Sequence, residues 1–190
     1  TVADVAITAD HADLGGNNAV QATATVIKDT ILPSILTNTI AAGTYIIGDT
    51  IDMVVTFSEN ITPIGTESID LTIGAATRTA TQSASTANSI TYSYTVVESD
   101  LDTDGIVGSV SLTGGTGIVD AVGNVFANSV PTTTFATQFV DGVKPTITNV
   151  TIASATYGDT DQIDVVVTYD DAVTIAAGTP EIPFVFDTEL

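Results

Sequence analysis

The sequence contains no cysteine, no tryptophan and very few basic residues. The absence of cysteine excludes disulfides and thiolate metal sites. Only Lys28, Arg78 and Lys144 stand against 23 acidic residues, which gives a formal net charge of -20. No basic patch can therefore neutralise phosphates, and we expect neither nucleic acid nor an anionic membrane surface as a partner. Cations are the partners that such a surface favours.

Long apolar runs are also missing. No run approaches the roughly 20 residues that a membrane-spanning helix needs, so we expect no membrane insertion. The residues around Thr1 lack the basic segment of a signal peptide, and we expect any export signal to lie outside this chain or to have been removed. The chain is nevertheless 44% hydrophobic with a mean hydropathy of +0.38. This apolar content is enough to form a core.

Short segments rich in Val, Ile, Thr and Tyr alternate with clusters of Gly, Asn, Asp and Pro, a pattern typical of an all-β protein. Two segments show apolar residues at every second position, as expected of half-buried strands: Ile51, Met53, Val55 and Phe57 within 50–57, and Ile90, Tyr92, Tyr94 and Val96 within 89–97. Further strands are expected at 34–40, 68–73, 78–82, 106–113 and 132–139. Seven strands of this kind predict an immunoglobulin-like Greek-key β-sandwich.

The chain also contains an internal repeat of about 112 residues. "DTILPSILTNTIAAGTY" from Asp29 corresponds to "DGVKPTITNVTIASATY" from Asp141, and the match continues with 51–57 against 163–169. In front of these segments, 5–17 mirrors 110–124, and each ends in Asp-x-x-Gly-Asn. We therefore expect residues 1–28 to be the last strands of one repeat, 29–140 a whole repeat, and 141–190 the first strands of a third.

Partial repeats of this size pose a physical problem, because two or three strands can hardly bury an apolar face by themselves. We expect the two partial repeats to be completed either by further sequence in the same chain or by a neighbouring molecule.

The phrases "GTYIIGDTIDMVVTFSENI", "LTGGTGIVDAVGN" and "DGVKPTITNVTI" resemble the tandem immunoglobulin-like, or cadherin-like, repeats of prokaryotic surface adhesins and of cell-wall or surface-layer proteins. The resemblance covers nearly the whole chain in its three pieces. It implies sandwiches joined head to tail in a stalk or lattice, exposed at the cell surface outside the cell and often stabilised by calcium.

The segment "DLDTDG" contains the first half of a calcium loop. Asp100, Asp102 and Asp104 place carboxylates at alternate positions, and Gly105 permits a sharp turn. The residue at position 12 of such a loop is Ser111 instead of glutamate, and the flanks are expected strands, so an EF-hand is excluded. A simpler calcium loop and an acidic turn in which the Asp side chains cap their own backbone both remain open.

Strand direction places this loop in the fold. If consecutive strands alternate in direction, the turn at Asp100 lies at the same pole as Asp49 and Asp141, and the following repeat adds its own acidic loop. The sequence thus predicts a calcium site at the junction between repeats, with these candidate metal ligands: Asp100, Asp102, Asp104, Asp141, Asp170 and Asp171. Ca²⁺ there would neutralise the repulsion between carboxylates. The same reasoning groups Asp29, Glu59 and Asp120 at the other pole.

Other motifs favour no enzyme. The two Asp-x-x-Gly-Asn segments, 13–17 and 120–124, are typical of tight turns in which Gly and Asn adopt positive φ. His11, the single histidine, has no accompanying catalytic signature, and we interpret it as a surface residue. Nothing in the sequence suggests a catalytic constellation.

The leading hypothesis is a structural segment of an extracellular surface protein, an adhesin stalk or a wall or surface lattice, whose partners are neighbouring immunoglobulin-like repeats. One alternative is a self-assembling filament or sheet in which the terminal strands of one subunit complete the next. Another is a carbohydrate-binding module that takes a glycan or a host surface as its ligand. The host ligand and the number of repeats are open at this stage.

Overall fold

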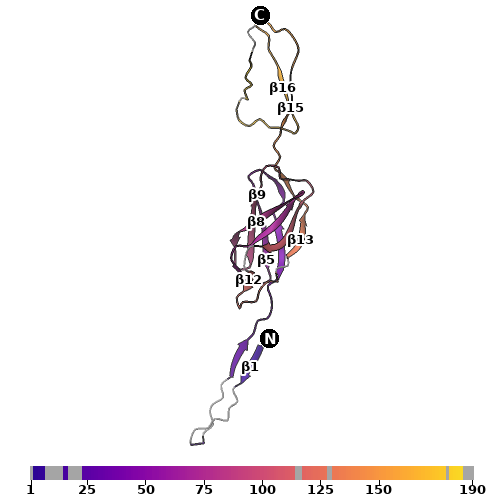
Figure 1. The fold of residues 1–190 in the computed structure, drawn as a ribbon. Helices are drawn as coiled ribbons and strands as arrows, with labels where there is room; N and C mark the ends of the chain where they lie inside the picture. The colour runs from indigo at the N-terminus through magenta and orange to yellow at the C-terminus, as the bar shows by residue number, and fades with distance from the viewer. Residues whose placement is uncertain are drawn as a thin grey trace. The chain divides into compact units, whose positions relative to one another are not determined.

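The computed structural model describes residues 2–6, 15–16, 23–113, 117–127, 130–178 and 180–185, and it contains strands and no helix within them (Figure 1). The chain divides into two compact units, Thr1–Gly142 and Val143–Leu190. The first unit begins with an antiparallel hairpin of β1 (Val2–Ala6) and β2 (Thr23–Ile27). The second unit contains β15 (Ile147–Ile152) and β16 (Val165–Tyr169).

The remaining strands of the first unit form its main body. They are β3 (Ile35–Ile40), β4 (Gly43–Ile46), β5 (Thr50–Phe57), β6 (Ile61–Ile64), β7 (Ser68–Ile73), β8 (Ala76–Ser85), β9 (Ser89–Thr95), β10 (Leu101–Asp102), β11 (Ile106–Thr113), β12 (Gly117–Asp120), β13 (Val130–Phe135) and β14 (Gln138–Asp141). The ranges predicted from alternation for β5, β7 and β11 coincide with the observed strands. The prediction for β8 is too short, because Ala80 is its single buried residue and its remaining side chains offer little apolar contrast.

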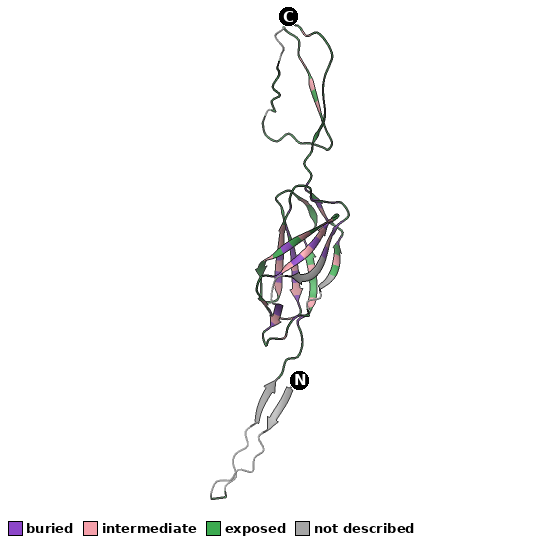
Figure 2. Cartoon of the chain, viewed as in Figure 1, coloured by how far each residue is buried: buried purple, intermediate pink, exposed green. Residues whose placement is uncertain are grey.

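A seven-stranded antiparallel sheet with the order β13-β11-β7-β8-β9-β5-β3 encloses the core. The predicted inward face of β5 is confirmed, because Ile51, Met53, Val55 and Phe57 are all buried. From β9, Ile90 and Tyr92 join the same core, and Tyr94 packs against it. Buried positions are concentrated in the strands of this main body (Figure 2). Each such large apolar side chain contributes about 1.5–3 kcal/mol when it is fully buried. The all-β prediction is thus confirmed, and the curled sheet is consistent with a β-sandwich.

The two edge strands of this sheet approach each other. Asn38 Nδ2 on β3 donates a 2.7 Å hydrogen bond to Thr133 Oγ1 on β13. The sheet therefore curls far enough for a side-chain contact to link its first and last strands.

A predicted single strand over 132–139 is wrong in one respect, because the chain turns at 136–137 and continues as β14. There, buried Gln138 donates from Nε2 to the carbonyl of Ile40 over 2.8 Å, and its Oε1 accepts the backbone N–H of Thr137. Whereas β13 pairs with β11, β14 pairs in parallel with β4 and antiparallel with β10. A buried polar side chain that bonds the backbone of the turn and the backbone of β3 thus accompanies the change of partner.

The chain enters and leaves the main body of the first unit at opposite ends of β5. At the N-terminal pole, where the chain enters, Ser58 N–H donates to the carbonyl of Ser34 over 2.8 Å. The chain leaves at the C-terminal pole. There, the N–H of Val96 donates to the backbone carbonyl of Asp49, and the N–H of Ser99 donates to the backbone carbonyl of Gly142, each over 2.9 Å. These contacts confirm that the turns at Asp49 and Asp100 lie beside the exit strand.

The second unit reproduces the pairing of β3 with β5. In the first unit Ile35 opposes Phe57, the register then shifts, and Thr37 opposes Thr56. A shift of 112 positions turns these pairs into Ile147 with Tyr169 and Asn149 with Thr168, and both pairs are observed between β15 and β16. The register of β15 and β16 is also irregular at the corresponding position, between Ile147 and Asn149.

Smaller contacts recur at the same offset. The hydroxyl of Tyr45 donates to the carbonyl of Ala41 over 2.8 Å, and that of Tyr157 donates to Ala153 over 2.7 Å. Asp49 accepts the N–H of residue 46, and Asp161 accepts that of Gly158. Corresponding segments thus fold locally in the same way, down to individual side-chain contacts.

Candidate cation sites at the two poles

Asp100, the first residue of the predicted calcium loop, is buried and paired within the protein. Its Oδ1 lies 2.6 Å from Nη2 of Arg78 and accepts a hydrogen bond from Nε over 2.7 Å. Its Oδ2 accepts hydrogen bonds from the Tyr94 hydroxyl over 2.5 Å and from the N–H of Val97 over 3.0 Å. Each carboxylate oxygen thus receives two donors, and these contacts hold Asp100 and its loop in place.

The electrostatics of this carboxylate follow from the same contacts. Burial by itself raises the pKa of Asp100, but the hydrogen bonds from Tyr94, Val97 and Arg78 outweigh burial and hold the pKa below its ordinary value. Burial, followed by the hydrogen bond to Asp100, raises the pKa of Tyr94 to about 12. Asp100 is therefore an anion, and Tyr94 a neutral donor, at neutral pH.

Asp102 caps the backbone of two loops. Its Oδ2 accepts the N–H of Gly74 over 2.7 Å, and its Oδ1 accepts those of Asp104 over 3.2 Å and Gly105 over 2.6 Å. Asp102 is buried, while Asp104 is exposed. Gly105 has φ +114, and a Cβ there would lie 2.7 Å from the Phe135 carbonyl oxygen, so only glycine fits. This geometry is that of an acidic turn in which an Asp side chain caps its own backbone, one of the two interpretations that the sequence allowed.

The other predicted ligands lie on both units. Asp141 ends β14 and opposes Leu101 of β10, so it is next to the Asp100 loop. In the second unit, Asp170 accepts the N–H of Thr146 over 2.7 Å and also its hydroxyl, and these hydrogen bonds lower the pKa of Asp170. Asp171 accepts the N–H of Ala172 over 2.6 Å. The structure thus brings Asp100, Asp102 and Asp141 to one pole, and a calcium site shared with Asp170 and Asp171 stays a prediction.

The acidic cluster at the opposite pole is confirmed as a spatial group. Carboxylate oxygens of Asp29, Glu59 and Asp120 all lie within 4.8 Å of one another. Asp29 comes from the chain entering the main body, Glu59 follows β5, and Asp120 ends β12. Three segments distant in the sequence therefore place one carboxylate each at a single point.

Asp120 is held by the turn that the Asp-x-x-Gly-Asn motif predicts. Its Oδ1 accepts the N–H groups of Val122 and Asn124 over 2.9 and 2.8 Å, and Gly123 has φ +92. Asn124 does not adopt the predicted positive φ. Its side chain instead donates to Asp120 Oδ2 over 2.7 Å and to the carbonyl of Ile31 over 3.2 Å. The motif thus connects the turn to the entering chain.

The counterpart of this motif at 13–17 lies outside the described residues except for Gly15 and Gly16, and so does His11.

The cluster has the electrostatics of a site that favours a cation. Burial, followed by the charges of Asp120 and Asp29, raises the pKa of Glu59. Burial also acts to raise the pKa of Asp120, but hydrogen bonds from Asn124 and the turn backbone lower it overall. Three carboxylates supply the hard oxygen ligands that Ca²⁺ takes, with backbone carbonyls and water to fill its 6–8 positions. The cluster therefore offers three of the oxygen ligands that Ca²⁺ takes, and a bound cation would neutralise their mutual repulsion.

Sequence reasoning missed the partner of Asp100. Arg78 lies on β8, far from the acidic loop in the sequence, and only the antiparallel pairing of β8 with β9 brings it beside Tyr94 and the loop. The available signal was that Arg78 is one of just three basic residues in the chain.

No protein-family model, curated protein or solved structure gives a significant match to this chain. Among the residues that the structure describes, no helix has the length and apolar character required to span a membrane.

Proposed function

We propose that the chain is a structural segment of tandem immunoglobulin-like repeats in an extracellular surface protein, serving as a stalk or as part of a wall or lattice. The observation that carries this proposal is the recurrence of one strand pairing, with its irregularity and its side-chain contacts, at an offset of 112 residues. A repeat array requires units with corresponding strands and short connections between them. Here the corresponding strands recur in both units, and a short segment ending in Pro145 joins the units.

The parallel pairing of β4 with β14 supports a force-bearing role. The chain reaches β4 from the N-terminal pole through β3, whereas β14 runs out at the C-terminal pole. Tension applied through the chain therefore pulls the two parallel strands in opposite directions along their length. All hydrogen bonds between them are loaded together, instead of breaking one after another.

Single-molecule pulling tests this role, and the absence of cysteine allows unique attachment points. Attachment through cysteines at Asp29 and Val143 loads β4 and β14 in shear. Attachment at Ala42 and Ala136, both exposed and just before the two strands, peels the same pair from one end. We expect a several-fold higher unfolding force in the first geometry, with release of about 400 Å of extended chain. Equal forces in the two geometries would contradict a force-bearing role.

We further propose that Ca²⁺ at Asp29, Glu59 and Asp120 stiffens the N-terminal pole. At a calcium concentration of 100 times Kd, ligand binding adds about 2.7 kcal/mol to the free energy of unfolding. Wild-type protein should therefore melt several degrees higher in calcium than in chelator. Glu59→Gln should lose most of this rise, and in chelator it should melt no lower than wild type, because it removes one of three repelling charges.

Glu98→Gln, a matched change at the exposed C-terminal pole, should keep the calcium response. Calorimetry of wild type, Glu59→Gln, Glu98→Gln and Asp104→Asn with and without calcium gives the comparison. A calcium response that survives Glu59→Gln and disappears in Asp104→Asn would move the ion to the opposite pole, and an unchanged wild-type melting temperature would refute calcium binding altogether.

A further inference from the structure

We propose that Asn60 is a glycosylation site, at which the side-chain amide nitrogen is joined to the first sugar of a glycan. The inference rests on the extracellular location proposed above, because sugars are attached to motifs of this kind on exported proteins. It goes beyond that location by naming the modified residue, the class of modification and the surface that the sugars cover.

Asn60, Ile61 and Thr62 form an Asn-x-Thr acceptor motif, placed where β5 has ended and β6 begins. Ile61 is buried in the core with 6% exposure, whereas Asn60 and Thr62 are exposed. Because side chains at alternate positions of an extended segment share one face, the acceptor amide and the hydroxyl two residues later lie on the same outward side. A glycosyltransferase can therefore reach both groups that define the motif.

Hydrogen bonding distinguishes Asn60 from the asparagines that have a structural role. Asn38 donates from Nδ2 to Thr133 over 2.7 Å, and Asn124 donates from Nδ2 to Asp120 over 2.7 Å. Neither of these asparagines is followed, two residues later, by Ser or Thr. Within the described part of the chain, the side chain of Asn60 makes no hydrogen bond. The fold thus leaves the amide of the acceptor motif available for modification.

An apolar surface begins beside this motif. Thr62 of β6 pairs with Val119 of β12, and Val119 in turn bridges to Val125. On the same face, Ile64 is 45% exposed and Val125 is 53% exposed. Ile64 lies about 13 Å beyond Asn60 along the strand, a distance that a chain of a few sugars spans. Sugar rings have apolar C–H faces, so a glycan on Asn60 would remove apolar side chains from water by lying over them.

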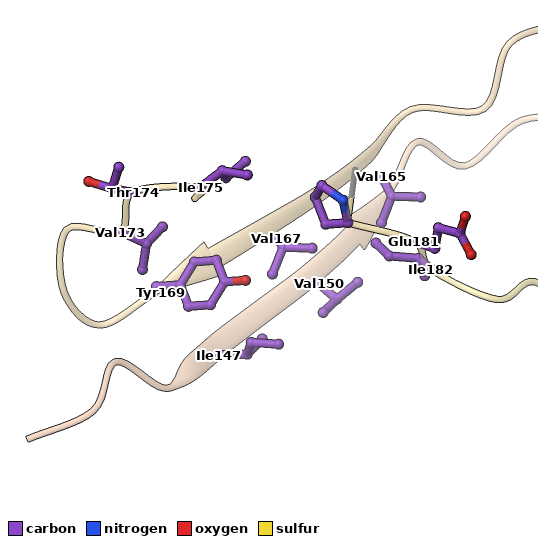
Figure 3. Close-up of a pocket in the computed structure, with 11 residues that line it drawn as sticks. Ile147, Val150, Val165, Val167, Tyr169, Val173, Thr174, Ile175, Glu181 and Ile182 are labelled. Atoms are coloured by element: carbon purple, nitrogen blue, oxygen red, sulfur yellow. The ribbon is translucent and has the colours of Figure 1, made fainter. Parts of the chain in front are cut away.

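The second acceptor motif, formed by Asn149, Val150 and Thr151, lies within a strand. Val150 lines the apolar groove of the second unit, as Figure 3 shows, so alternation directs Asn149 and Thr151 to the opposite side. Asn149 pairs with Thr168 in the ladder of β15 with β16, whereas Asn60 precedes its strand. We therefore expect Asn60 to be the better acceptor, because an enzyme can bend the chain there without breaking a ladder.

The reaction balances with a lipid-linked sugar as the donor. The amide nitrogen of Asn60 attacks the anomeric carbon of a sugar that is held on a polyprenyl diphosphate. A C–N bond forms as the C–O bond to the diphosphate breaks, and the lipid diphosphate leaves with the bonding electrons. The amide proton passes to a base of the transferase, so no oxidant or reductant is required.

Mass spectrometry of the protein from its source cells tests the proposal, and the scarcity of basic residues helps the digest. Trypsin cleaves after Lys28 and Arg78, which places Asn60 in the peptide 29–78 as its single acceptor motif. Fragmentation by electron transfer keeps sugars attached and assigns an added mass to one residue. We expect the mass of a chain of sugars on Asn60, at higher occupancy than on Asn149.

Variants made in the same cells test the individual residues. Asn60→Gln removes the acceptor, and Thr62→Val removes the hydroxyl, so both should lose the added mass from the peptide 29–78. Thr62→Ser keeps the motif and should keep the sugars. Asn88→Gln changes an exposed asparagine outside any acceptor motif, and this matched control should be modified like wild type. Circular dichroism should be the same for all variants, because the changed side chains are exposed.

A peptide 29–78 without added mass, or with its sugars on Ser or Thr hydroxyls, would overturn the proposal, as would sugars on Asn149 alone. Labelling of intact cells with a membrane-impermeant amine reagent separates this failure from failure of the proposed function, because Lys28 and Lys144 are exposed and would report a surface location. Labelled lysines with an unmodified Asn60 would reject the glycan alone. Unlabelled lysines would reject the surface location.

Discussion

Replacing Asp102 by alanine is expected to lower the free energy of unfolding of the first unit by about 3 kcal/mol. The buried carboxylate accepts three backbone N–H groups, from Gly74, Asp104 and Gly105, and alanine would leave these donors without an acceptor in a site with little water. A loss of this size lowers the melting temperature by roughly 10 °C in a unit of this length. Chemical denaturation monitored by tyrosine fluorescence would measure the change.

Asp104→Ala is the matched control within the same loop. Asp104 is exposed, and its substitution should change stability by no more than about 0.5 kcal/mol. If the loop were instead a calcium site, both substitutions would reduce stability in calcium and neither would do so in chelator. The stability of the two variants in both solutions therefore separates a structural turn from an ion site.

Arg78→Met should lower the melting temperature of the first unit by a few degrees at neutral pH. Methionine keeps the aliphatic part of the side chain but removes the cation that faces the buried Asp100 carboxylate at 2.6 Å. Tyr94 and Val97 continue to donate to that carboxylate, which limits the loss.

This loss should depend on pH in a defined direction. The pKa of Asp100 is lower in the folded protein than in the unfolded chain, so its stabilising contribution is complete above the unfolded pKa of about 3.9 and is lost as pH falls through the lower folded pKa. Wild type and Arg78→Met should therefore differ most above about pH 5 and converge in acid. A difference that stays constant down to about pH 2 would show that packing by Arg78, and not its charge, is responsible.

The sequence could predict those strands whose own residues alternate clearly between apolar and polar. In β5 and β7 a buried residue occurs at every second position, so their limits follow from alternation. The four-residue strands β4, β6 and β12 could not be found in this way, because they are too short to show a period and are defined by partners far along the chain.

The candidate sites divide along similar lines. Strand direction alone was enough to group Asp29, Glu59 and Asp120, since it depends on the number of strands between them. The roles of Asp100 and Asp102 could not be predicted, because they depend on Arg78 and Gly74, two residues brought close by the packing of separate hairpins. An alternating Asp pattern is compatible with ion binding and with backbone capping, and only the three-dimensional partners distinguish the two.

The contact between Asn38 and Thr133 has a consequence for crowding at a surface. Exposed strand edges tend to pair with those of neighbouring molecules, and such pairing causes aggregation at high local density. In the first unit the two outermost strands of the main sheet face each other, so little of either edge is available to a neighbour. The main sheets of neighbouring first units should therefore not pair edge to edge when copies are densely arrayed.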